Sequence, residues 1–221
     1  MKLYSYWRSS SAWRVRIALT WKGLAHDLVP IHLLRDGGEQ HLPEFVARNP
    51  AHQVPVLVED DGAAEPFVLT QSMAIIEYLE ERHPEPPLLP REPRARARVR
   101  ELAQLVNSGI QPLQNLTVQQ KLREAGVDPL PVVHGFVTTG LGALEQRART
   151  EAGQFLVGDV PTMADLYLVP QLYASRRVGV NVDDFPTLRA IELRCEALPA
   201  FQRAHPDAQP DREPPAPTPA R

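Results

Sequence analysis

The chain has 221 residues, 43% of them hydrophobic and 23% charged, which is ordinary for a globular protein of one or two domains. The formal net charge of −3 argues against nucleic acid as a partner, because nucleic-acid-binding proteins carry a basic surface. The single cysteine, Cys195, excludes an intramolecular disulfide and a cysteine-cluster metal site, and it fits a reducing compartment. No apolar run approaches membrane-spanning length and a predicted strand follows residue 1 directly, so we expect a cytoplasmic protein without signal peptide or membrane anchor.

Strand and helix patterns alternate over residues 1–85. Strands are predicted at 2–7, 26–34, 54–60 and 65–71, where alternating or continuous apolar residues are bounded by turn residues. Helices are predicted between residue 12 and the stop signal Gly23, at 42–50 and at 72–83. This order of elements predicts a small mixed sheet with helices on its faces, so the first domain is of the α/β class.

The proline-rich stretch 86–93 is predicted to be a linker between two domains. Beyond it the patterns are helical only, over 94–116, 136–148 and 186–204, so residues 94–205 are predicted to form an all-α domain. A further helix is predicted after Thr162, because Asp165 three residues later completes a capping box. The last segment, 206–221, lacks apolar residues that could offset its ordering entropy, and it is predicted to be a disordered tail.

Three successive serines, Ser9, Ser10 and Ser11, precede the first predicted helix in the segment YWRSSSAWRVRIAL. Serine competes for backbone hydrogen bonds inside a helix but is favoured at its N-terminus, where its oxygen accepts from a backbone N–H. One helix cap needs only one serine. The other hydroxyl groups are therefore available to a ligand above the helix end.

Two further junctions point to the recognition of a peptide-like ligand. Pro55 opens a strand, and a cis Val54–Pro55 bond would leave the backbone of Val54 free to pair with an extended ligand; an ordinary trans proline is the alternative. Gln71 and Ser72 stand between a strand and a helix, where N–H groups and the helix dipole favour a carboxylate. The alternative for Ser72 is that it only caps its own helix.

Five segments together resemble the zeta class of glutathione transferases: YSYWRSSSAWRVRIAL, NPAHQVPVL, QSMAIIEYLEE, GIQPLQNLTV and VPTMADLYLVPQ. The resemblance extends from about Lys2 to Pro210 in order and spacing. It implies a thioredoxin-like N-terminal domain that binds glutathione, a helical C-terminal domain of the glutathione-transferase type, and a homodimer. It also implies glutathione-dependent cis–trans isomerisation of a small dicarboxylate, as in the conversion of maleylacetoacetate to fumarylacetoacetate during tyrosine catabolism.

The resemblance also assigns roles to individual residues. Ser9 takes the place of the hydroxyl group that donates to the glutathione sulfur, and Ser10 and Ser11 complete the catalytic loop. The residues implied for glutathione are Ser9, Ser10, Ser11, Gln40, Val54, Pro55, Gln71, Ser72, Gln111 and Asn115. The chain departs from the family at Ser11, where a cysteine is usual, so thiol chemistry from the protein is absent at this position.

The chemistry of the implied reaction explains why serines are needed. A free thiol has a pKa near ~8.5, and donors at a positive helix end favour the thiolate. That thiolate adds to the conjugated double bond, which becomes a single bond. The adduct rotates about this bond and then expels the thiolate, which restores the double bond as the other isomer. Arginines suit the two substrate carboxylates, and the resemblance implies Arg8 and Arg177.

Some charged residues are predicted to have structural roles or none. Arg14 and Arg16 lie within the first helix, where ion pairs with the rest of the fold are the expected role. The histidines show no ligand spacing, so no metal site is predicted. Other functions stay open: a maleylpyruvate isomerase, a zeta-type transferase or dehalogenase acting on α-haloacids, or a non-catalytic glutathione-binding protein.

Overall fold

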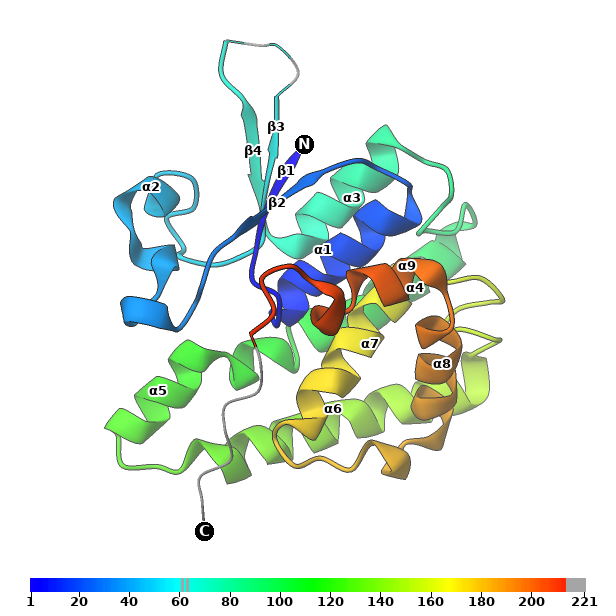
Figure 1. Ribbon diagram of the computed structural model, residues 1–221. Coiled ribbons are helices and arrows are strands. Elements are labelled where there is room, and N and C mark those ends of the chain that lie inside the picture. The colour runs from blue at the N-terminus through cyan, green and yellow to red at the C-terminus, as the bar shows by residue number, and fades with distance from the viewer. Residues whose placement is uncertain (61, 63, 214–221) are drawn as a thin grey trace.

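The computed structural model describes residues 1–60, 62 and 64–213, and its first part is built on a four-stranded sheet. The strand order is β2-β1-β3-β4, with β1 and β2 parallel and the other neighbours antiparallel. The strands are β1 (Lys2–Ser5), β2 (Asp27–Pro30), β3 (Val56–Glu59) and β4 (Phe67–Thr70). Figure 1 shows α1 (Ser10–Trp21) and α3 (Ser72–Arg82) on one side of this sheet, with α2 (Pro43–Val46) on the other.

The rest of the described chain is helical, as predicted. The helices are α4 (Pro93–Asn107), α5 (Leu116–Glu124), α6 (Pro129–Glu151), α7 (Met163–Arg176), α8 (Pro186–Glu196) and α9 (Pro199–Ala204). The capping box before α7 is confirmed, since the backbone N–H and the hydroxyl group of Thr162 both donate to Asp165 Oδ2, at 2.8 and 2.9 Å. No helix in the described ranges is long and apolar enough to cross a membrane.

Helix α1 is the centre of the molecule. Its residues from Ala12 to Leu19 are all buried, because α1 packs between the sheet, α3, α7 and α9. One continuous apolar core consequently extends from Leu3 in the sheet to Ala204 in α9. The polar side chains of a helix buried on all sides must find their hydrogen-bond partners within the protein. The partners of the two buried arginines of α1, Arg14 and Arg16, therefore show which groups lie around this helix.

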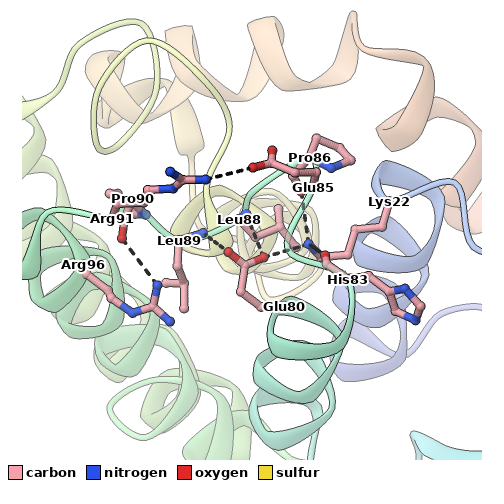
Figure 2. A network of polar contacts seen from close by, with 10 residues as sticks. All are labelled: Lys22, Glu80, His83, Glu85, Pro86, Leu88, Leu89, Pro90, Arg91 and Arg96. Carbon is pink, nitrogen blue, oxygen red and sulfur yellow. Dashed lines mark hydrogen bonds and ion pairs between the residues drawn. The ribbon is translucent and has the colours of Figure 1, made fainter.

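A buried ion pair fixes the linker to the first domain (Figure 2). The Lys22 ammonium group donates to Glu80 Oε2 at 2.7 Å and to the carbonyl oxygens of His83 and Pro86 at 2.6 and 3.0 Å. The Glu80 carboxylate also accepts from the backbone N–H groups of Leu88 and Leu89, both at 3.0 Å. All three lysine donors and both carboxylate oxygens are thus used, so the chain leaves α3 in one defined direction.

The helical pattern predicted over 94–116 is interrupted in the structure. Helix α4 ends at Asn107, and a short 3-10 helix, η3 (Gln111–Gln114), precedes α5. Ile110 is buried at this turn against Gly140 of α6, where any Cβ would come within 2.4 Å of the Ile110 side chain. This close approach, together with Pro112 inside the former pattern, turns the chain so that Gln111 faces α1.

The prediction of disorder for 206–221 is wrong for its first part. Residues Pro206–Ala208 form a 3-10 helix, Gln209 is buried, and Asp211 accepts from the backbone N–H of Trp7 at 2.9 Å. Polar contacts of this kind order the segment, and they could not be predicted from its lack of apolar residues. Residues 214–221 lie outside the described residues.

Candidate functional site

The register of the sheet brings the predicted site segments to one edge. Tyr4 lies opposite Val56, and Val56 lies opposite Thr70. The carboxyl ends of β1 and β4 therefore meet the start of the antiparallel strand β3. The loop that carries Ser9, the Val54–Pro55 bond and the Gln71–Ser72 junction consequently share this edge, with α1 and α3 both beginning there.

The junctions at this edge have an unusual backbone. The Val54–Pro55 peptide bond is cis, one of the two alternatives that the sequence leaves open, and both residues are buried. Gln71 has a φ of 67°, rare for a residue other than glycine and typical of ligand sites. Ser72 is buried as the first residue of α3, and no side-chain hydrogen bond caps this helix among the described residues. The alternative that Ser72 only caps its own helix is therefore wrong, because Gln71 occupies the N-cap position.

The three serines have different hydrogen-bond partners. Ser9 is the N-cap of α1 and its oxygen accepts from Ala12 N–H at 3.3 Å. Ser10 donates to the Pro170 carbonyl oxygen of α7 at 3.3 Å, and Ser11 donates to Gln111 Oε1 at 3.4 Å. Since a hydroxyl group has one proton, Ser9 is the serine whose donor is uncommitted among the described residues.

The helical part reaches the site through η3. Gln111 Oε1 accepts from Ser11 and Arg14, which leaves the amide NH₂ group of Gln111 to donate elsewhere. Asn115 is exposed and caps α5 by accepting from Thr117 N–H at 3.0 Å, so its side-chain oxygen already has a structural role. Gln111 and the serines are brought together, whereas no described contact joins Asn115 to them.

Gln40 carries an unsatisfied polar atom. Its Nε2 donates to the Leu33 carbonyl oxygen at 3.3 Å, while its Oε1 is buried without a hydrogen-bond partner among the described residues. The side chain lies directly over Gly38, where a Cβ would come within 2.4 Å of it. A buried acceptor without a partner is costly, so this oxygen suits a ligand N–H.

The two neighbouring arginines at the C-terminal end of α7 differ in their partners. Arg176 makes a two-pronged ion pair with the buried Glu192 carboxylate at 2.7 and 2.6 Å, which raises its pKa. Arg177 has no carboxylate partner in the described chain. Its partial removal from water lowers its pKa, and the charge of Arg8 lowers that pKa further. Arg8 itself lies over the Trp7 ring at 5.3 Å. Two cations that lack carboxylate partners in the described ranges, one of which lowers the pKa of the other, favour binding of an anion.

The ion pairs predicted for Arg14 and Arg16 are absent from the described residues. Arg16 donates to backbone carbonyl oxygens, including those of Trp7 at 2.8 Å and Ala204 at 3.2 Å. Arg14 donates to Asn107, Ser11 and Gln111, all neutral. Sequence reasoning therefore missed a link between Arg14 and the serines, although Ser11 and Arg14 are spaced i, i+3 on one helix face.

Comparisons with known proteins identify the family. Residues 3–87 match the family model "Glutathione S-transferase, N-terminal domain", and residues 137–199 match "Glutathione S-transferase, C-terminal domain". A thioredoxin-like domain followed by a helical domain, with polar groups converging between them, defines this class of protein, and the predicted fold class is confirmed. The chain belongs to the glutathione S-transferase family.

Within this family, the chain is similar to isomerases of the zeta class. The maleylacetoacetate isomerase of Pseudomonas aeruginosa is 48% identical over 214 residues, covering 96% of this chain and 98% of that protein. Crystal structures of the maleylacetoacetate isomerase of Anaeromyxobacter dehalogenans, with bound glutathione and with bound dicarboxyethyl glutathione and citrate, match at TM-scores of 0.88 and 0.86. They are 53% and 52% identical, and each comparison covers 96% of this chain and 97% of the other. A maleylpyruvate isomerase described as a bacterial zeta-class enzyme matches at a TM-score of 0.90 and 41% identity, covering 96% of this chain and all of that one.

Proposed function

We propose that this chain is a glutathione-dependent cis–trans isomerase that converts maleylacetoacetate to fumarylacetoacetate in aromatic amino-acid catabolism. The observation that carries the proposal is the pair Arg8 and Arg177, neither of which has a carboxylate partner among the described residues. Arg8 directly precedes Ser9, and its charge acts on Arg177. A substrate with two carboxylates suits two guanidinium groups. The relatives named as maleylacetoacetate isomerases support the same assignment.

The residues at the sheet edge fit glutathione. Gln40 Oε1 has no hydrogen-bond partner in the described part of the chain, and the start of α3 with Ser72 suits the γ-glutamyl carboxylate. The backbone of Val54 beside Pro55 suits the peptide part of glutathione, and the Gln111 amide group can donate from the helical domain. When bound, glutathione supplies a thiolate that adds reversibly to the substrate double bond.

The protein's own groups prepare that chemistry. Ser9 donates its free hydroxyl proton to the sulfur, and the positive end of α1 adds to this stabilisation, so the thiol pKa falls. Ser10 and Ser11 hold the start of α1 against α7 and η3. Arg8 and Arg177 orient the substrate carboxylates, which keeps the double bond beside the sulfur position.

Isomerisation of maleylpyruvate is the second candidate, because a maleylpyruvate isomerase matches the chain at a TM-score of 0.90. The test compares both substrates at equal enzyme concentration, with and without glutathione, and follows glutathione by titration of free thiol. Faster turnover of maleylacetoacetate, with glutathione required but recovered unchanged, supports the proposal. Faster turnover of maleylpyruvate favours the second candidate. Stoichiometric loss of thiol with an α-haloacid and no isomerisation would identify a transferase or dehalogenase instead.

Replacement of Ser9 by alanine is expected to raise the pKa of the bound thiol by about one unit, because a hydrogen bond to an anion is lost. Turnover at neutral pH should fall about tenfold, while glutathione affinity changes less. The measurement is thiolate absorbance of the bound complex against pH. Ser10→Ala is the matched control, since the Ser10 donor is already committed to Pro170. An unchanged thiol pKa in Ser9→Ala would remove Ser9 from the role.

We also propose that the chain is a cytoplasmic homodimer, as the family resemblance implies. The β4 side chains Phe67 and Val68 are 45% and 38% exposed, and apolar groups of this size are suited to a subunit interface. Light scattering is expected to give twice the mass of one chain. Phe67→Asp should shift the protein to monomers, whereas Leu193→Asp, which alters an exposed leucine of α8, should leave the dimer intact. A parent protein that is monomeric at micromolar concentration would refute the dimer.

A further inference from the structure

Arg14 is a buried cation that has no acidic partner among the residues that the structure describes. Its side chain is completely buried, and its guanidinium group contacts neutral groups from four elements. It donates to Asn107 Oδ1 of α4 at 3.0 Å, to Ser11 Oγ at 3.2 Å and to Gln111 Oε1 of η3. It also lies 3.9 Å from the ring centre of Tyr167 in α7.

Such an arrangement is unusual, because buried charges in proteins are normally paired with an opposite charge. Burial lowers the pKa of Arg14, and the Tyr167 phenol opposes that shift. Arginine still keeps its proton in proteins, so the positive charge stays in a medium of low dielectric constant. Arg16 differs: burial lowers its pKa to about 9, but the Asp211 carboxylate of the C-terminal segment partly offsets this effect.

The contacts of Arg14 reach the serine segment that is proposed to hold the glutathione sulfur. Ser11 lies two residues after Ser9 in the first turn of α1, and the Gln111 amide NH₂ group donates no hydrogen bond among the described residues. We propose that Arg14 is a positioning residue that holds Ser11 and Gln111 in place and, through its uncompensated charge, favours the thiolate form of bound glutathione. This inference rests on the proposed function.

The variant Asn107→Asp tests the charge without removing the arginine. Aspartate has nearly the shape of asparagine, so it keeps the contact to Arg14 but supplies the missing carboxylate. Compensation of a nearby charge at an effective dielectric constant near ~20 is expected to raise the pKa of the bound thiol by about one unit. The readout is thiolate absorbance of the glutathione complex against pH, which does not depend on turnover.

Two controls separate the charge of Arg14 from other effects. Ser108→Asp adds the same charge one residue later on an exposed side chain, and Asn107→Ala removes the contact without adding charge. Neither should move the thiol pKa by more than about 0.3 units, because both leave Arg14 uncompensated. If Asn107→Asp does not fold, the pair Arg14→Lys and Arg14→Gln takes its place, and only the glutamine variant should raise the pKa.

The outcomes distinguish this inference from the proposed function. A rise in the thiol pKa in Asn107→Asp alone supports the role of Arg14. Equal values in Asn107→Asp and the parent, or equal rises in Asn107→Asp and Ser108→Asp, would overturn it while leaving glutathione binding intact. Calorimetry of the parent with glutathione is the first step, and an absence of binding there would overturn the proposed function and this inference together.

Discussion

Replacement of Arg177 by methionine is expected to lower kcat/KM for a dicarboxylate substrate about ten- to a hundredfold. Arg177 is exposed, has no carboxylate partner among the described residues and lies near a second unpaired cation, Arg8. A charge-assisted hydrogen bond contributes roughly 1.5–3 kcal/mol, and each ~1.4 kcal/mol is a factor of ten. Methionine keeps much of the side-chain bulk, so collapse of the site does not explain the loss. Steady-state kinetics over a range of maleylacetoacetate concentrations measures the effect.

The control for Arg177→Met is a second substrate. Conjugation of glutathione to a neutral haloalkane uses the same sulfur subsite but carries no carboxylate, so its rate should change less than threefold, by roughly 0.6 kcal/mol or less. Arg177→Lys should recover part of the dicarboxylate activity, because the charge remains but the two-pronged contact is lost. Equal losses on the charged and neutral substrates would show that Arg177 supports the fold instead of the substrate.

Replacement of Glu80 by alanine is expected to lower the free energy of unfolding by about 3–5 kcal/mol. The change leaves the buried Lys22 ammonium group without its counterion and removes the acceptor for the N–H groups of Leu88 and Leu89. Removal of one partner of a buried ion pair typically costs this much. Because domains of this size are stable by roughly 5–15 kcal/mol, the loss should be plain in urea denaturation.

The matched control lies in the same linker (Figure 2). Arg91 pairs with Glu85 at 3.4 Å, and both side chains are largely exposed. Arg91→Ala should therefore change the free energy of unfolding by less than about 1 kcal/mol. Similar losses in Glu80→Ala and Arg91→Ala would contradict the view that burial makes the Lys22–Glu80 pair important.

Local patterns predicted the parts of the structure that depend on local chemistry. The alternation of strands and helices in the first half is visible because apolar residues recur with the period of each element and turn residues separate the elements. The capping box at Thr162 and Asp165 was equally visible, since it is complete within four residues. The break after Asn107 was not, because it depends on the packing of Ile110 against Gly140, thirty residues further along.

In the candidate site, too, local features could be predicted from the sequence, whereas contacts between distant residues could not. The serines and the Val54–Pro55 bond could be predicted because the residue types themselves are unusual at those positions. The partners of Arg14 could not, since Asn107 and Gln111 are distant in sequence and neutral, whereas sequence reasoning assigns buried arginines to carboxylates. The contact between Asp211 and Trp7 could not be predicted for a related reason. A segment without apolar residues is predicted to be disordered, and its hydrogen-bond partner is distant in sequence.

The position of α1 has a consequence for synthesis on the ribosome. Helix α1 is synthesised long before α9, which supplies both an apolar face that covers α1 and the Ala204 carbonyl oxygen that accepts from Arg16. Until then, the most apolar helix surface of the N-terminal half lacks its cover, and its arginines lack part of their acceptors. The first domain therefore completes its packing only once α9 has been synthesised, so α1 keeps an exposed apolar surface that chaperones can bind while the helical domain is being translated.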